Sequence, residues 1–294
     1  MNSQYNNKAS ALTVDVEDAV NQAMRNFFAT DMKPTERVFN NTMQLLDLFS
    51  ENNVLATFFI LGEVAEEYPD LIREIANRGH ELGIHGYSHA RYYNISKGQA
   101  REEIVRAKHL VEDISGVQVS GHRAPEFSVN PKTLWVMEIL LDAGIKYDSS
   151  IFPANAGRYG WPGFNKEIDW LHLSDGRKII EAPLSVVNYF GKEIPSCGGG
   201  YLRLFPYFFT NHAFRRILKK RPVNVYLHPY EIDSPPFQQF YMDAVKRSPM
   251  KDRIQIKMYW YNRNSVFSKL KRLLQDFKFN SLRNVINDAL QVNI

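Results

Sequence analysis

The chain lacks the features on which several protein classes depend. It contains one cysteine, Cys197, among 294 residues. That count excludes a disulfide scaffold and a structural zinc site built from several thiolates. No apolar run reaches the roughly 18–20 residues that a transmembrane helix needs. Residues 1–10 are polar and contain no apolar signal core, so we expect a cytoplasmic location.

The overall composition is that of a folded globular protein. Hydrophobic residues make up 44% of the chain and charged residues 23%. The 19 Phe, 15 Tyr and 4 Trp residues supply enough apolar surface to exclude disorder as the dominant state. We find no internal repeat, low-complexity tract or clear linker. We therefore expect one barrel domain over residues 1–240, with a basic helical extension over 241–294 packed on the same domain.

Positive charge is concentrated near the C-terminus. The net charge is +4, yet residues 246–283 carry eleven Lys and Arg against two acidic residues, which gives that segment +9 and the rest −5. Such a segment could contact nucleic acid, anionic lipid or an acidic polymer, or be a solvated helix face. Its interleaved apolar residues favour amphipathic helices packed on a core. Because a nucleic-acid binder is usually more basic overall, we expect no nucleic acid partner, and peripheral membrane contact stays a candidate.

Strand-like and helix-like segments alternate through the first half of the chain. Short apolar runs fall at residues 11–16, 54–61, 81–84 and 117–121. Helical periodicity falls at residues 36–53, 64–77, 96–114 and 131–143. Residues 150–206 are rich in Gly and Pro and predict loops with a hairpin or two, before a helix at 207–220 and a strand at 223–227. This alternation predicts an α/β fold with buried parallel strands.

Ionisable side chains follow the predicted strands, where α/β folds place their catalytic groups. The first strand ends in Asp15-Val16-Glu17-Asp18. Three carboxylates so close together stay ionised only if a positive group lies among them. The alternative is a solvated turn or a helix N-terminus, where acidic residues are favoured. Strand alternation would place Glu17 on the same side as Asp15 if the strand continues that far.

Three further strand ends carry candidate functional residues. His85 and His89 are four apart, which on a helical turn puts two nitrogen donors on one face for a single metal. Arg123 precedes Pro125, which ends the strand ladder, and can pair with a carboxylate. His228 ends an apolar strand and is a candidate proton donor. The alternatives are unrelated histidines, a surface salt bridge and a core histidine.

In their order and spacing, these strand ends resemble the five motifs of the polysaccharide deacetylase family of carbohydrate esterases, the chitooligosaccharide-deacetylase homology group. The corresponding segments are ALTVDVED, HGYSH, GHRAP, YDSSIFP and YLHP. The resemblance covers roughly residues 9–232. The segment GGGYLRLFP and the basic tail resemble the branch found in bacterial exopolysaccharide gene clusters. The resemblance implies a distorted (β/α)7 barrel, here with a C-terminal helical extension.

The resemblance also implies a metal-dependent hydrolase that removes N-acetyl groups from amino sugars of a polysaccharide or its precursor. The expected metal is zinc, with cobalt, nickel or manganese as other candidates. Carried over by motif, His85 and His89 are two of its ligands. The family's first motif has two adjacent Asp residues, which this chain lacks, so the carboxylate ligand is either Asp18 or Glu17. We give a slight preference to Asp18.

The remaining motif positions imply catalytic roles. Asp15 would be the general base, oriented by Arg123. His228 would protonate the departing amine, and Asp148 would support the His228 side of the site. A backbone N–H beyond Pro125, near Glu126, would help the metal to hold the tetrahedral oxyanion.

Two features bear on the substrate. Glu126 stands where the family commonly has Tyr. Its carboxylate would either lie beside the acetyl pocket and favour a different, cationic substrate, or point away from the pocket. Tyr201 begins an aromatic stretch, residues 201–209, that would line a substrate groove or a subunit contact, and an oligomer stays open. One alternative function is hydrolysis of another C–N bond, such as a cyclic amide. Another is a non-catalytic carbohydrate-binding barrel, although a pure binder does not need the full set of Asp15, His85, His89, Arg123 and His228.

Overall fold

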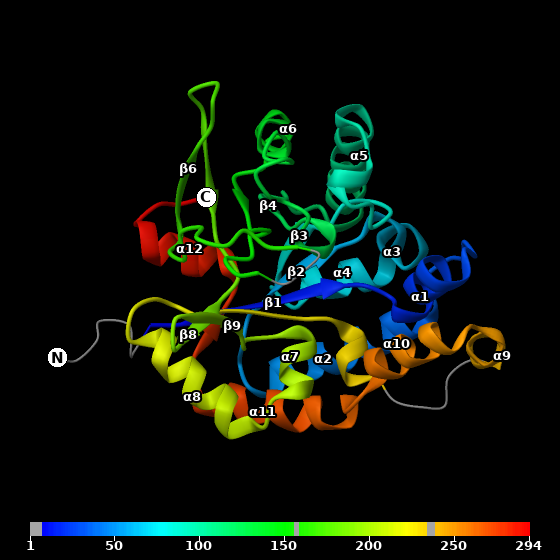
Figure 1. Cartoon of the computed structure of the whole chain (residues 1–294). Helices are drawn as coiled ribbons and strands as arrows, with labels where there is room; N and C mark the ends of the chain where they lie inside the picture. Colours follow the sequence, from blue (N-terminus) through cyan, green and yellow to red (C-terminus); the bar gives the residue numbers. More distant parts are fainter. Residues whose placement is uncertain (1–7, 156–158, 234–238) are drawn as a thin grey trace.

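One curled sheet organises the computed structural model, which describes residues 8–155, 159–233 and 239–294. The strand order is β10-β1-β2-β3-β4-β5-β7-β6, and β11 pairs with the start of β1 (Figure 1). The strands are β1 (Ser10–Val16), β2 (Thr57–Ile60), β3 (Glu81–Ile84), β4 (Gly121–His122), β5 (Tyr147–Asp148), β6 (Asp169–His172), β7 (Lys178–Glu181), β10 (Asn224–Leu227) and β11 (Phe279–Asn280).

The sheet is an open, distorted barrel. Neighbouring strands from β10 to β7 are parallel, and β6 is antiparallel to β7. In the part of the chain that the structure describes, β10 forms no ladder with β6 or β7, so the barrel is not closed. The distorted (β/α)7 barrel predicted from the sequence is confirmed. A separate hairpin, β8 (Val186–Tyr189) and β9 (Lys192–Pro195), projects from the sheet.

Helices cover both sides of the sheet. Figure 1 shows β1 between α5 and α6 on one side and α2, α8 and α11 on the other. The helices are α1 (Ala19–Phe28), α2 (Glu36–Glu51), α3 (Gly62–Glu67), α4 (Pro69–Asn77), α5 (Lys97–Ser115), α6 (Val136–Asp142), α7 (Gly199–Leu204), α8 (Tyr207–Leu218), α9 (Gln239–Arg247), α10 (Met250–Trp260), α11 (Val266–Asp276) and α12 (Leu282–Leu290). The short 3-10 turns are η1 (Tyr92–Asn94), η2 (Pro125–Phe127), η3 (Pro229–Ile232) and η4 (Arg263–Ser265).

Local sequence signals fix several of these elements. The Ser96 hydroxyl accepts a hydrogen bond from the Gln99 N–H in a capping box that starts α5, and Gly116 ends the helix in the left-handed region at φ +69°. Pro69 begins α4, so the helical segment expected at 64–77 is divided into α3 and α4. Each of these signals acts over four residues or fewer, which explains why the sequence alone reveals them.

Three elements differ from the prediction. Helix α1 was not predicted, because its signal lies in tertiary contacts: Val20 and Met24 pack against α9 and α10. The strand expected at 117–121 is shortened to β4. The helix expected from Pro131 starts only at Val136, after a series of turns.

The C-terminal segment is integrated into the fold. Strand β11 pairs in parallel with β1, and the inner faces of α11 and α12 are buried. Helices α9 and α10 pack on α1 through a small cluster of their own. The expected division at residue 240 stays a prediction. The segment after it supplies β11 to the central sheet. Among the described residues, no helix combines the length and apolarity required to span a bilayer.

His80 is a buried histidine that serves the core, not the site. Its ring lies 5.0 Å from that of Phe58 and 6.1 Å from that of Phe49, and its Nδ1 accepts a hydrogen bond from the Ala56 N–H at 3.1 Å. Burial, aided by the positive charge of Arg78, lowers the pKa of His80 to about 4. The neutral ring is therefore the folded form at neutral pH.

We predict that His80 makes the protein acid-sensitive. A folded-state pKa below the unfolded value means that the unfolded chain binds more protons as the pH falls from 6.5 towards 4. Stability from this group is complete near pH 7 and falls by about 2 kcal/mol at pH 5. Urea unfolding of the wild type and of His80→Gln at pH 7 and pH 5 measures this change in the free energy of unfolding. The exposed control His109→Gln should keep the wild-type pH dependence, and an equal dependence in His80→Gln would contradict the prediction.

Candidate active site

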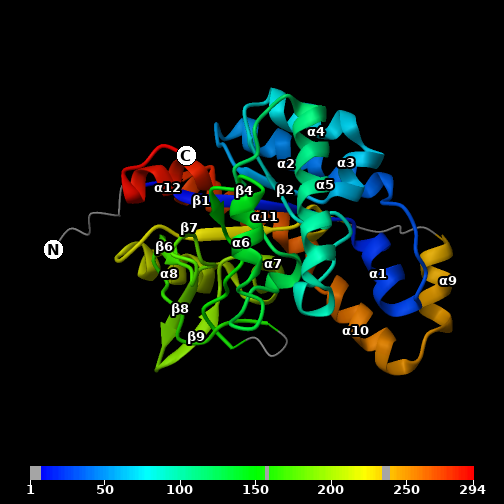
Figure 2. The same ribbon diagram turned by 90° about the horizontal axis from the view of Figure 1, so that it is seen from above.

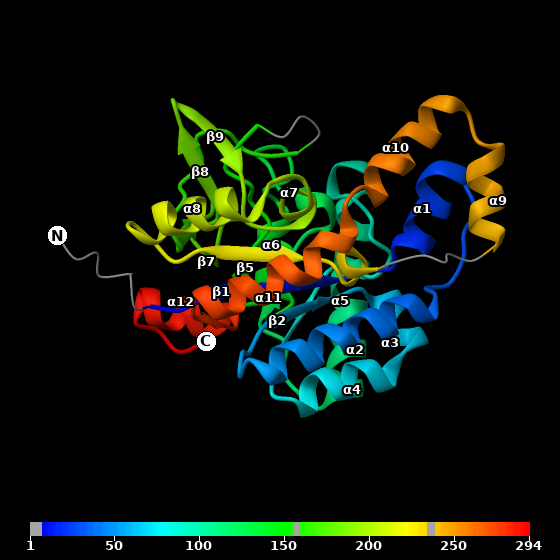
Figure 3. The same ribbon diagram turned by 90° about the horizontal axis from the view of Figure 1, so that it is seen from below.

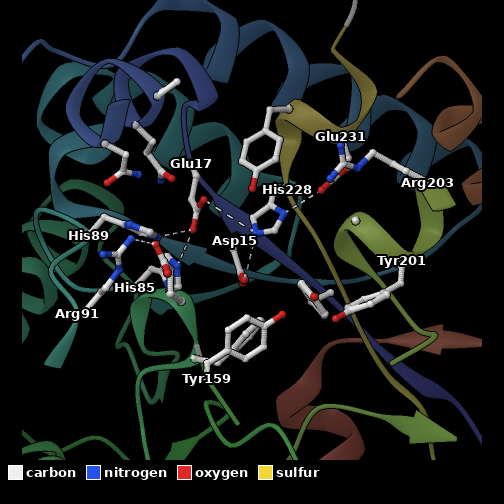
Figure 4. A pocket seen from close by; sticks show the side chains of 18 of the residues that line it. Asp15, Glu17, His85, His89, Arg91, Tyr159, Tyr201, Arg203, His228 and Glu231 are labelled. Carbon is white, nitrogen blue, oxygen red and sulfur yellow. Dashed lines mark hydrogen bonds and ion pairs between the residues drawn. The ribbon is translucent and has the colours of Figure 1, made fainter. Parts of the chain in front are cut away.

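The carboxyl ends of β1, β3, β4 and β10 open into one cavity of about 950 Å³. Neighbouring parallel strands end at the same edge of the sheet, so the loops that follow them converge. These loops bring together Asp15, Glu17, His85, His89 and His228, which are far apart in the sequence. Figure 4 shows these five side chains pointing toward one another. The cavity is therefore the candidate active site.

Glu17, His85 and His89 form a compact cluster of metal-ligating atoms. Glu17 Oε1 lies 2.8 Å from His85 Nε2 and 3.0 Å from His89 Nε2. One ligand atom from each residue lies within 4.8 Å of the others. Two imidazole nitrogens and one carboxylate oxygen are a donor set of catalytic zinc sites, which leave a further position for water or substrate. The residues present fit a divalent metal.

Backbone groups after β3 and β4 orient the two histidines. His85 Nδ1 donates to the carbonyl oxygen of Arg123 at 2.8 Å, which turns its Nε2 towards Glu17. The chain then bends through Gly86 at φ +76° and His89 at φ +62°. The sequence placed this pair on a helical turn, and that local expectation is wrong. The two imidazoles meet because left-handed residues fold the loop back, not because of helical periodicity.

The slight preference for Asp18 as the carboxylate ligand is corrected by its contacts. Asp18 Oδ1 accepts from the Val20 N–H at 2.8 Å and caps α1. Its Oδ2 accepts from the Thr35 N–H. With both oxygens held by backbone donors, Asp18 belongs to the helix terminus, and Glu17 is the carboxylate that fits the cluster.

Glu17 is suited to hold a cation. Burial alone would raise the pKa of its carboxyl group, but His89, His228 and His85 outweigh burial and hold that pKa well below its usual value. The side chain is 4% exposed. A buried carboxylate that stays ionised needs positive charge beside it, which a divalent metal would supply.

Asp15 is fixed by the most deeply buried arginine of the site. Arg123 Nη1 donates to Asp15 Oδ1 at 2.8 Å and to Thr13 Oγ1 at 2.7 Å. Its Nη2 donates to Ser149 Oγ at 2.8 Å, and its side chain has no exposed area. These contacts immobilise one Asp15 oxygen. The other, Oδ2, lies 3.9 Å from His228 Nε2. Figure 4 shows the two side chains facing each other.

His228 is held by residues that follow it and by α7. Its Nδ1 lies 3.3 Å from Glu231 Oε1, and Glu231 Oε2 lies 2.8 Å from Arg203 Nε. The ring stacks on Tyr230 with centroids 4.5 Å apart. Burial would lower the pKa of His228, but Glu17, Glu231 and Asp15 together raise it above its ordinary value. These carboxylates shift the balance of His228 towards its protonated form.

The structure does not bring Asp148 to His228, which corrects the supporting role expected for it. Asp148 Oδ1 lies 2.6 Å from His122 Nδ1, and Ser150 Oγ donates to the same oxygen at 2.7 Å. Ser150 Oγ in turn accepts from the Ala124 N–H at 2.7 Å. Asp148 therefore braces the backbone that leads into η2.

Glu231 and Arg203 were missed in the sequence. A signal existed for Glu231, because it stands three residues after His228, within reach of that imidazole. Nothing local pointed to Arg203, which contacts Glu231 only through the fold. Burial would raise the pKa of Glu231, but His228 and Arg203 hold that pKa below its usual value.

The predicted substrate-side residues lie on the cavity wall or just behind it. Glu126 pairs with Arg91 at the rim and adopts a left-handed backbone at φ +48°. Pro125 begins η2 and is buried. Tyr201 lines the cavity opposite Arg91, with its ring stacked 6.4 Å from that of Phe205. The oxyanion role of the backbone near Glu126 stays a prediction.

Two family models together account for most of the chain. Residues 6–147 match the model described as polysaccharide deacetylase. Residues 149–287 match a domain of unknown function (DUF3473). The junction falls after β5, so both halves contribute strands to the same sheet. The first supplies Asp15, Glu17 and both cluster histidines, and the second supplies His228.

Curated relatives and solved structures agree with these matches. A peptidoglycan-N-acetylglucosamine deacetylase from Bacillus cereus is 29% identical over 126 residues, which cover 43% of each chain. A crystal structure assigned as a polysaccharide deacetylase from Mycobacterium smegmatis superposes with a TM-score of 0.64 at 20% identity, over 96% of this chain and 90% of that one. PuuE allantoinase superposes with a TM-score of 0.62 at 14% identity, over 95% and 89%. At these identities the two structures show the fold alone. The chain spans less than half of the length of the curated relatives it matches.

Proposed function

Because the chain belongs to the polysaccharide deacetylase family through residues 6–147, we propose that it is a metal-dependent hydrolase of N-acetyl groups on amino sugars. The substrate would be a polysaccharide or its precursor, and exopolysaccharide is the class that the sequence motifs suggest. The observation that carries the proposal is the Glu17–His85–His89 cluster in one cavity with Asp15 and His228. The curated relative from Bacillus cereus, a deacetylase of N-acetylglucosamine in peptidoglycan, supports this reaction class.

Asp15 would act as the general base. Glu17, His85 and His89 would hold a divalent ion, for which zinc is the first candidate. The ion would polarise the acetyl carbonyl and lower the pKa of the attacking water. Arg123 fixes one Asp15 oxygen at 2.8 Å, so the second oxygen is left to accept the proton of that water.

His228 would donate a proton to the departing amine. Glu231 contacts Nδ1 of His228, which leaves Nε2 facing the cavity. Arg203 holds Glu231 in turn. All three residues lie in the half that matches the domain of unknown function, so we propose that this half supplies the acid side of the reaction.

The rim of the cavity would hold the sugar. The backbone N–H near Glu126, braced through Ala124 and Ser150, would support the developing oxyanion. Tyr159 and Tyr201 present aromatic surface on one side of the cavity, where a sugar ring can pack. Arg91 neutralises Glu126, which argues against a cationic group as the determinant of binding.

A hydrolase of cyclic amides is the second candidate, since PuuE allantoinase has the same fold. The metal test separates the possibilities before any substrate is identified. We expect about one zinc per chain after loading and dialysis. Acetate should then be released from N-acetylglucosamine oligomers, lost with a chelator and restored by zinc. Absence of metal after loading would overturn the proposal, as would hydrolysis of allantoin with no acetate release from the oligomers.

A further inference from the structure

Exposed apolar side chains are concentrated in one short part of the molecule. Twelve large hydrophobic residues are exposed among those that the structure describes, and six of them lie between residues 240 and 267. They are Phe240, Met242, Met250, Ile254, Tyr261 and Phe267. Such a concentration on a water-soluble surface marks an interaction site.

Helix α10 has an inner and an outer apolar face. On the inner face, Ile256 and Trp260 join the cluster that packs on α1. On the outer face, Met250 and Ile254 are 69% and 57% exposed, and Tyr261, in the turn directly after the helix, is 54% exposed. At about 100° per residue, Ile254 falls within about 40° of Met250, so the two form one stripe along the helix, and Tyr261 follows directly after its end.

Basic side chains border this outer stripe. Lys251 lies on one side of it, and Arg253 and Lys257 lie on the other, all three exposed. Residues 239–260 contain five basic residues and two acidic ones, Asp243 and Asp252. An apolar stripe between cationic side chains can contact both the acyl region and the anionic headgroups of a bilayer.

The stripe leads to the catalytic cavity. Ile254 and Asp252 of α10 line the same cavity as Glu17 and His228. Figures 2 and 3 place α9 and α10 with α1 at the end of the molecule opposite α12, where they project beyond the sheet. A flat surface resting on α10 would therefore lie beside the mouth of the cavity.

We propose that the outer face of α10 binds an anionic phospholipid surface. Met250 and Ile254 gain hydrophobic free energy by leaving water for an apolar environment, which a lipid bilayer offers and a hydrated acidic polysaccharide does not. Pairing of this face with a second copy would oppose Lys251, Arg253 and Lys257 to their own equivalents. The lipid surface satisfies both the apolar stripe and its charged borders, whether or not the chain is a deacetylase.

Vesicle sedimentation of the full chain tests this surface. Vesicles of phosphatidylcholine with phosphatidylglycerol should bind the protein, and vesicles of phosphatidylcholine alone should bind it much less. Met250→Ser/Ile254→Ser should lower partitioning about tenfold or more, because two apolar side chains no longer enter the bilayer. Lys251→Gln/Lys257→Gln should weaken binding to the anionic vesicles. The matched control is Phe190→Ser on the β8–β9 hairpin, where Phe190 is 103% exposed, and it should bind as the wild type does.

Several outcomes would overturn the assignment. Equal binding to both vesicle types would show that the basic side chains do not contribute to binding. Unchanged binding of the folded serine variant would show that the apolar stripe does not contribute. Folding of each variant is checked by its thermal unfolding midpoint. A dimer by light scattering that the serine variant abolishes, without vesicle binding, would assign the face to a second copy. Metal content and acetate release are measured separately, so failure of the deacetylase proposal is distinguishable from failure of this one.

Discussion

Glu17→Gln is expected to abolish stable metal binding, whereas Asp18→Asn is expected to retain it. Glu17 Oε1 lies within 3.0 Å of both imidazole Nε2 atoms, and its negative charge is what a divalent cation would neutralise. A neutral amide keeps the shape but removes that charge, so metal affinity should fall steeply. Elemental analysis after zinc loading and dialysis, with competition against a chromophoric chelator, measures the effect. Acetate release should be lost in parallel.

The Asp18 variant is a matched control because it alters the neighbouring carboxylate in the same way. Asp18 accepts hydrogen bonds from the Val20 and Thr35 N–H groups, and the amide of Asn can accept only one of them, so the variant should lose about 1 kcal/mol of stability. Its zinc content should equal that of the wild type. The opposite pattern, with metal lost from Asp18→Asn and kept by Glu17→Gln, would restore Asp18 as the ligand.

Asp15→Asn is expected to lower kcat by about 10²–10⁴-fold, the usual contribution of a general base. The metal should remain bound, because Asp15 is not among the three clustered residues. The variant cannot accept a proton from the attacking water, although its side-chain oxygen can still receive the hydrogen bond of Arg123. Steady-state acetate release and zinc content, measured on the same preparation, test both parts.

Removal of Asp15's charge also leaves buried Arg123 without its ion-pair partner, so a structural effect must be separated from a chemical one. Thr13→Val provides the control: it removes another Arg123 contact, at 2.7 Å, and leaves the carboxylate in place. We expect Thr13→Val to lose stability but to retain most of its turnover. A folded Asp15→Asn enzyme with wild-type kcat would exclude Asp15 as the base.

The sequence contained the order of the site motifs because each motif is short and follows a strand. Asp15, His85 and His228 reach the cavity from the strand ends where the apolar runs placed them, and Arg123 lies buried behind Asp15. Parallel strands bring their carboxyl ends to one edge whatever their spacing along the chain. The general location of the site was therefore predictable, although its pairwise contacts were not.

Those contacts depend on residues far apart in the chain. Glu17 and His85 are 68 positions apart, and Arg123 and Asp15 are 108 apart. Whether Glu17 or Asp18 turns towards the histidines depends on where β1 ends and on the Thr35 N–H, which claims one Asp18 oxygen. Similarly, Asp148 contacts His122, and the carboxylate that contacts His228 Nδ1 is Glu231.

The sequence by itself determined the strand and helix alternation, the cap of α5 at Ser96 and the motif order, since these arise from interactions between near neighbours and from the burial of apolar faces. Only the tertiary structure decided which carboxylate joins the histidines and which acid supports His228. It also left the outer face of α10 exposed while its inner face packs on α1. The physical reason is that a polar side chain could form hydrogen bonds of nearly equal strength with several groups of the chain. Only the packed fold decides which of these groups lies within hydrogen-bonding distance.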